Sequence, residues 1–182
     1  MCHTRAVYTP DRYVAALRFA SQKHEGQRMT DGQFPYLVHV VSVASEVIAA
    51  LEPGLDADLA VQCALLHDTL EDTQTTYAEL AEQFGERVAA GVLALSKTDE
   101  AIPKPARMQD CLRRIRLQPR EVWIVKLADR ITNLAPPPAQ WSSEKRLAYH
   151  AEANLIADAL AGASPLLEAR IRDRITGYSA YF

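Results

Sequence analysis

The chain has 182 residues, of which 48% are hydrophobic and 24% are charged, with a formal net charge of -3 and a pI near 6.0. This length allows one well-buried core, and the acidic balance disfavours a general nucleic-acid or membrane-surface binder, which needs a broad basic surface. Three cysteines without a CxxC pair disfavour both a disulfide framework and a thiolate zinc site, and Cys63 is expected to be a small core residue.

The chain contains no apolar stretch long enough to span a membrane, and Met1–Arg5 leads into no apolar core of a signal peptide. We therefore expect a cytoplasmic protein without a membrane segment, in which residues 1–182 form a single domain.

Thr9 followed by Pro10 predicts the start of a first helix that ends near His24. Residues 25–38 are mostly polar and contain two glycines and a proline, which predicts a loop. From His39 the apolar residues recur at helical spacing, which predicts a second helix that ends at Pro53–Gly54. A lone histidine on an apolar helix is more often a core residue than a ligand. His39 therefore becomes a candidate metal ligand only in combination with other potential ligands.

Asp56 predicts the N-cap of a third helix, which continues through an apolar run into His67, Asp68, Glu71 and Asp72. At about 100° per residue, a continuous helix aligns these residues in pairs at i,i+4 and forms one polar stripe. Three carboxylates on a packed helix need a cation, which a metal ion would supply. The alternative is a solvated helix end.

Thr76 and Glu79 predict a capping box for a short helix ending at Phe84–Gly85, and residues 86–95 predict the next helix. Residues 96–106 predict a loop. The cationic residues Lys97, Lys104 and Arg107, in or just after this loop, either face an anionic ligand or belong to a solvated turn. A further helix is predicted to include Met108 to Leu117.

Pro119 predicts the start of a helix to Leu134 that is apolar on nearly all sides and therefore buried. Asp129 and Asn133 lie at i,i+4 on one face of it. A buried carboxylate must be paired or bind a metal, and the adjacent Arg130 offers an internal salt bridge as the alternative.

Pro136–Pro138 breaks the chain before a helix capped by Ser142 or Ser143, which is predicted to run to about Ala161. Ser164–Pro165 predicts the start of a last helix over residues 164–178. No segment shows sustained alternation of apolar and polar residues, so the predicted fold is all-α.

His39, His67, Asp68 and Asp129 together supply two imidazoles and two carboxylates from three predicted helices, which is the composition of a metal site. Four segments carry a family resemblance in chain order: Gly26-Gln27-Arg28, Pro35-Tyr36-Leu37-Val38-His39, Leu66-His67-Asp68-Thr69-Leu70-Glu71-Asp72-Thr73 and Lys126-Leu127-Ala128-Asp129-Arg130-Ile131-Thr132-Asn133-Leu134. Over about residues 10–160, the chain resembles the HD-domain phosphohydrolases, and more narrowly the hydrolase domain of the RelA/SpoT homologue superfamily.

The resemblance implies an all-α HD-domain helical bundle that holds one divalent ion through His39, His67, Asp68 and Asp129. Because these ligands include no thiolate, Mn²⁺ is the expected ion, with Fe²⁺ or Zn²⁺ as alternatives.

The resemblance also assigns roles around the ion. Glu71 and Asp72 are expected to take the proton of water and orient it, with Asn133 as a hydrogen-bonding residue. Predicted substrate contacts are Arg28 on the base, Lys145 and Tyr149 on phosphates, and Lys97 and Arg107 as weaker candidates. For Lys145 and Tyr149, the alternative is an exposed amphipathic helix.

The implied activity is that of a stand-alone small alarmone hydrolase, which removes the 3′-pyrophosphate from (p)ppGpp or its adenosine analogue (p)ppApp. The alternatives are another HD-domain nucleotide phosphohydrolase and a silent alarmone-binding regulator. Met29, Val40 and Ala135 replace residues that are usual in the family, which leaves the base preference open. The expected partner is a small-molecule nucleotide, with no nucleic acid and no membrane, and homo-oligomerisation is left open.

Overall fold

The computed structural model describes residues 7–30, 32–97 and 101–182, so Met1–Arg5 lies outside the described part. Within this part the chain is helical, and its β pairing is limited to an isolated bridge between Arg28 and Pro35. The helices are α1 (Pro10–Lys23), α2 (Leu37–Ala49), α3 (Ala57–Leu66), α4 (Thr69–Asp72), α5 (Tyr77–Phe84), α6 (Glu86–Leu95), α7 (Lys104–Ile115), α8 (Arg120–Asn133), α9 (Ser143–Ala159), α10 (Pro165–Tyr178) and a short 3₁₀ turn (Ser179–Tyr181). The all-α prediction is confirmed.

Several helices begin where the sequence supplies a side-chain cap. The side-chain oxygens of Asp56, Thr76, Ser142 and Ser164 each accept a hydrogen bond from the backbone N–H three residues further on, at 3.0, 3.2, 3.2 and 3.5 Å. These bonds satisfy amide groups that have no partner inside the helix. The starts predicted at these caps are confirmed.

Three predicted boundaries are wrong. The second helix begins at Leu37, so His39 lies inside its first turn rather than at its start. The loop predicted over residues 96–106 ends earlier, because the helix predicted to include Met108 already begins at Lys104, after Pro103 and with the next proline in its first turn. The third helix ends at Leu66, and a separate α4 covers Thr69–Asp72.

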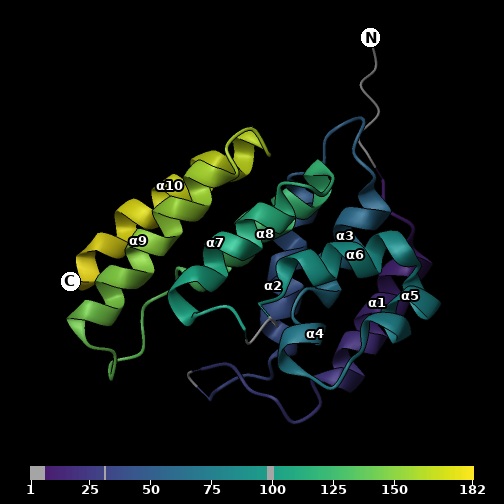
Figure 1. The fold of residues 1–182 in the computed structure, drawn as a ribbon, viewed down its shortest axis with the longest axis horizontal. Coiled ribbons are helices and arrows are strands. Elements are labelled where there is room, and N and C mark those ends of the chain that lie inside the picture. The colour runs from purple at the N-terminus through teal and green to yellow at the C-terminus, as the bar shows by residue number, and fades with distance from the viewer. Residues whose placement is uncertain (1–6, 31, 98–100) are drawn as a thin grey trace.

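The central helix α3 packs against α1, α2, α6 and α8. All of its residues except Asp58 are buried, which explains its continuous apolar sequence. Figure 1 shows α9 and α10 as a neighbouring pair on one side of the molecule, and both contact α8. None of the described helices is long and apolar enough to cross a membrane.

Helices α3 and α6 approach closely at Gly91. A Cβ atom at this position would lie 2.7 Å from the Cys63 sulfur, which is too short for a normal contact. Cys63 is fully buried, as predicted. Gly91 therefore allows the close packing that positions the end of α3.

Candidate functional site

Three parts of the fold bring the four predicted metal ligands together. His39 comes from α2, Asp129 from α8, and His67 and Asp68 from the junction of α3 and α4. His39 Nε2 lies 3.3 Å from His67 Nε2 and 3.5 Å from Asp129 Oδ1. Asp68 Oδ2 lies 2.8 Å from His67 Nε2 and 3.6 Å from His39 Nε2. His39, His67 and Asp129 thus offer atoms that lie within 4.8 Å of one another, and Asp68 reaches the group through the two imidazoles.

The break between α3 and α4 makes this convergence possible. Neighbouring residues of a regular helix point about 100° apart, so they rarely reach the same point. Here the helical hydrogen-bonding pattern is interrupted at His67 and Asp68, and the side chain of Asp68 meets that of His67. The continuous polar stripe predicted from the sequence is therefore wrong.

Hydrogen bonds orient both imidazoles. Because a carbonyl oxygen can only accept, His67 Nδ1 donates to Ala64 O at 2.8 Å, and its Nε2 faces the cluster. His39 Nδ1 lies 3.5 Å from the hydroxyl oxygen of Thr132, and its Nε2 also faces the cluster. Fixing one ring nitrogen in this way prepares the other to bind a metal.

The carboxylates dominate the electrostatics of the cluster. Burial acts to lower the pKa of His39, but its hydrogen bonds with Asp129 and Asp68 outweigh burial and raise the pKa to about 9. The pKa of His67 is also raised, because Asp68 again outweighs the effect of burial. Burial acts to raise the pKa of Asp129, but the nearby cationic groups, Lys126 first among them, hold it well below its usual range. The cluster is therefore built to hold positive charge.

Lys126 is a partner of Asp129 that the sequence analysis missed. Its Nζ lies 3.0 Å from Asp129 Oδ2, and both residues are buried. Asn133 Nδ2 donates to Asp129 Oδ1 at 2.5 Å, so both carboxylate oxygens are held. Arg130, the predicted alternative partner, instead pairs with Glu152. The i,i+3 spacing of Lys126 and Asp129 could have identified this pair.

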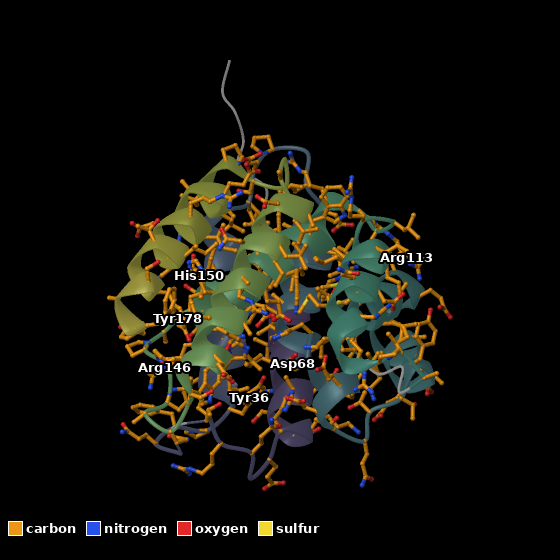
Figure 2. The ribbon with its side chains drawn as sticks, turned by 60° about the vertical axis from the view of Figure 1, so that its left-hand side comes forward. Tyr36, Asp68, Arg113, Arg146, His150 and Tyr178 are labelled. Atoms are coloured by element: carbon orange, nitrogen blue, oxygen red, sulfur yellow. The ribbon has the colours of Figure 1, made fainter. Side chains whose placement is uncertain are left out.

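Tyr36 is a second residue whose role was missed, although it lies in one of the resemblance segments. Its hydroxyl donates to Asp68 Oδ2, and Figure 2 shows the two residues next to each other, with Tyr36 below Asp68 in the view. The Tyr36 ring lies 5.0 Å from the ring of His24 and 5.2 Å from that of His39, measured between centroids. Burial and the charge of Asp68 raise the pKa of Tyr36, which keeps it a hydrogen-bond donor.

The two predicted proton-transfer carboxylates each have a partner. The backbone N–H of Lys97 donates to Glu71 Oε2 at 2.9 Å, and Lys97 Nζ lies 3.0 Å from Glu71 Oε1. Gln27 Nε2 donates to Asp72 Oδ2 at 3.2 Å. Burial, followed by the charge of Asp68, raises the pKa of Asp72. Lys97, predicted to contact substrate, binds Glu71 in this structure.

The other predicted cationic contacts are turned toward protein groups. The guanidinium of Arg28 donates to the carbonyls of Gly32 and Gln33, both at 2.7 Å. Arg107 Nε donates to Ile102 O at 2.9 Å, and Lys145 Nζ lies 4.1 Å from the centroid of the Trp141 ring.

A cavity of about 380 Å³ lies beside the cluster. Its lining includes Asn133 and Tyr149, which were predicted site residues, together with Met29, Ala135 and Trp141. Thr132, which contacts His39, also lines it. The cavity thus reaches Thr132 and Asn133, which contact His39 and Asp129, but none of the four proposed ligands lines it.

Residues 16–165 match the family model of the HD domain. The chain belongs to the HD domain family. This HD-domain chain is 32% identical over 163 residues to the guanosine-3′,5′-bis(diphosphate) 3′-pyrophosphohydrolase MESH1 of Xenopus tropicalis, covering 87% of this chain and 89% of the relative. It is 33% identical over 164 residues to the Homo sapiens protein of the same name, and the alignment covers 87% of this chain and 90% of that relative.

A bacterial relative matches a smaller part of the HD-domain chain. The guanosine-3′,5′-bis(diphosphate) 3′-pyrophosphohydrolase of Aquifex aeolicus is 39% identical over 122 residues, covering 65% of this chain and 17% of that protein. A solved structure, described as a metazoan ortholog of SpoT that hydrolyzes ppGpp and plays a role in starvation responses, matches with a TM-score of 0.81. It is 25% identical and covers 94% of this chain and 98% of the other. The resemblance predicted from the sequence is confirmed.

Proposed function

We propose that this HD-domain protein is a divalent-metal-dependent 3′-pyrophosphohydrolase of guanosine or adenosine alarmones. Water would cleave the bond to the 3′-pyrophosphate, so that ppGpp and water give GDP and pyrophosphate. The observation that carries this proposal is the convergence of His39, His67, Asp68 and Asp129 in a chain that aligns with 3′-pyrophosphohydrolases over most of its length.

The donor set fits a divalent ion. Two imidazole nitrogens and two carboxylates without a thiolate suit Mn²⁺ or Fe²⁺, and they also suit a catalytic Zn²⁺. The three atoms offered by His39, His67 and Asp129 lie within 4.8 Å of one another, and Asp68 reaches both imidazoles. When bound, the ion would supply Lewis-acid activation of water and of a phosphoryl oxygen.

The remaining steps would belong to side chains around the cluster. Glu71 or Asp72 would accept the proton of the attacking water at a carboxylate oxygen, and Asn133 would orient the reacting groups by hydrogen bonding. Asp72 lies one helical turn beyond Asp68, which places its carboxylate near the proposed ion. The hydrogen bond from Tyr36 would keep Asp68 directed at the ion.

The nucleoside would occupy the cavity beside Asn133 and Tyr149. The cationic residues proposed for the phosphates and base remain Arg28, Lys97, Lys145 and Arg107. Each would exchange its present protein partner for substrate. Met29 and Ala135 add neither charge nor a hydrogen-bonding side chain to the cavity, so we propose that it accepts both purines.

The other expectations remain proposals. One domain is supported by the packing of α10 against α8. A cytoplasmic location stays a prediction.

The test uses the purified chain, stripped of metal and then supplied separately with Mn²⁺, Fe²⁺ or Zn²⁺. Each form is incubated with ppGpp or ppApp, and the products are resolved by anion-exchange chromatography. We expect pyrophosphate and the 5′-diphosphate only after metal is added. Binding without turnover would favour a silent regulator, and phosphate release from simple 5′-nucleotides alone would favour another HD-domain phosphohydrolase. Full activity without metal would refute the proposed site.

A further inference from the structure

A chain of hydrogen bonds connects the end of α1 with the proposed proton acceptor Asp72. His24 follows α1 and is only 4% exposed. Its Nδ1 lies 2.6 Å from Gln27 Oε1, and Gln27 Nε2 donates to Asp72 Oδ2 at 3.2 Å. Gln27 therefore bridges a buried imidazole and a carboxylate that belongs to a different helix.

The chemistry of the three side chains determines which group donates and which accepts in each hydrogen bond. An ionised carboxylate can only accept hydrogen bonds, so the amide nitrogen of Gln27 faces Asp72 and its amide oxygen faces His24. His24 must then carry a proton on Nδ1 to complete the chain. Its Nε2 is buried and has no hydrogen-bond partner among the described residues. In the neutral imidazole this leaves Nε2 as a bare acceptor, so the tautomer is set through Gln27.

Packing holds His24 in this position. Its ring centroid lies 5.0 Å from that of Tyr36, whose hydroxyl donates to Asp68. The Gln27 amide donates a hydrogen bond to the Asp72 carboxylate from the loop before α2. Asp72 ends a short helix, so it gains little rigidity from its own element. The orientation of its carboxylate depends on the loop residue Gln27.

We propose that His24 is a positioning residue for Asp72 and acts through the side-chain amide of Gln27. The imidazole fixes which end of the amide faces Asp72, and the amide then holds the carboxylate in the direction needed to accept a proton from water. This proposal rests on the proposed function, in which Asp72 takes part in the reaction. His24 itself contacts neither substrate nor ion.

A first experiment needs no substrate. Long-range ¹H–¹⁵N NMR spectra of the ligand-free protein report which ring nitrogen of each histidine carries hydrogen, and a His24→Asn variant identifies the His24 signals. We expect a hydrogen-bonded Nδ1–H in the wild type and its loss in Gln27→Ala. A wild-type His24 protonated only on Nε2, or an Nδ1–H signal unchanged in Gln27→Ala, would overturn the proposal.

A second experiment compares kcat of two variants to separate the effect of the His24 N–H donor from that of its ring packing. His24→Phe keeps an aromatic ring against Tyr36 but removes the N–H donor, whereas His24→Asn keeps an N–H close to the position of Nδ1. We expect kcat to fall roughly tenfold in His24→Phe, because misplaced reacting groups react slowly, with KM and bound metal unchanged. His24→Asn should retain most of the wild-type kcat. If His24→Asn were as impaired as His24→Phe while both stayed folded, the donor would not be the important feature.

A double variant tests whether the two residues act as one unit. His24→Phe combined with Gln27→Ala should be no slower than Gln27→Ala alone, because either change already breaks the chain. Gln74→Ala serves as a matched control, since Gln74 is an exposed glutamine close to Asp72 in sequence. Additive losses would overturn the proposal. If the wild type hydrolysed no alarmone, the proposed function would fail, and the NMR experiment alone would decide the role of His24.

Discussion

Replacing Lys126 with methionine should destabilise the metal-free protein strongly. Lys126 and Asp129 are 5% and 7% exposed, and Lys126 Nζ lies 3.0 Å from Asp129 Oδ2. Methionine has a similar length but leaves the buried carboxylate without its nearest cation, with the imidazoles of His39 and His67 further away, at 3.5 and 3.9 Å. Removing one partner from a buried ion pair costs about 3 to 5 kcal/mol. In a chain of this size, about 1 kcal/mol lowers Tm by about 2 to 4 °C, so Tm should fall by roughly 6 to 20 °C.

The assay is thermal unfolding followed by circular dichroism, first with a chelator and then with saturating Mn²⁺. A divalent ion beside Asp129 replaces part of the missing positive charge, so Lys126→Met should gain more stability from Mn²⁺ than the wild type.

Lys23→Met is the matched control. Lys23 pairs with Glu79 at 2.7 Å, but the two side chains are 29% and 31% exposed. A solvated pair of this kind contributes about 0 to 1 kcal/mol. If Lys126→Met lost no more stability than Lys23→Met in chelator, the buried pair would not have the importance assigned to it here.

Three further predictions concern the ligands, the packing and the effect of pH. Asp129→Ala should lose bound Mn²⁺ by elemental analysis, whereas Glu71→Ala should keep the metal and lose most turnover; near-normal kcat in Glu71→Ala would exclude its role in proton transfer. Gly91→Ala should lose about 1 to 3 kcal/mol in urea unfolding through overpacking against the Cys63 sulfur, and Cys63→Ala should restore part of the loss. In the metal-free protein, hydrogen bonds with the Asp129 and Asp68 carboxylates outweigh burial and raise the pKa of His39 to about 9, above the unfolded value near 6.5. The protonated imidazole therefore stabilises the fold fully below pH 6.5, and this stabilisation is lost as the pH rises through 9. Unfolding midpoints measured from pH 6 to 10 in chelator should therefore fall over this range, and a midpoint that stayed constant would contradict the assignment.

Local signals in the sequence were sufficient to predict most helix starts. Asp56, Thr76, Ser142 and Ser164 cap helices through bonds that span three residues, so neighbouring residues contain all the information needed. The interruption after Leu66 could not be found in this way, because an unbroken apolar run reads as one helix. The break depends on the tertiary packing of α3 against α2 and α8, which neighbouring residues in the sequence do not reveal.

In the candidate site too, contacts within one helix could be predicted from the sequence, whereas contacts set by the tertiary fold could not. The i,i+4 pairing of Asp129 with Asn133 follows from helix geometry and is present. Lys126 was available to the same reasoning, but the salt-bridge alternative for Asp129 named the adjacent Arg130, although neighbouring residues on a helix face different directions. The directions of Arg28 and Lys97 were not predictable, because long cationic side chains adopt whichever nearby acceptors the fold provides.

The distribution of the cluster along the chain also has a consequence for protein synthesis. His39, His67 and Asp68 leave the ribosome well before Asp129, which lies on α8. Contacts between residues far apart in sequence form only after the entropy cost of closing the intervening chain has been overcome. A nascent chain that ends before α8 would hold three of the four donors and no complete cluster. Tight metal uptake should therefore begin only after α8 has emerged and packed against α2.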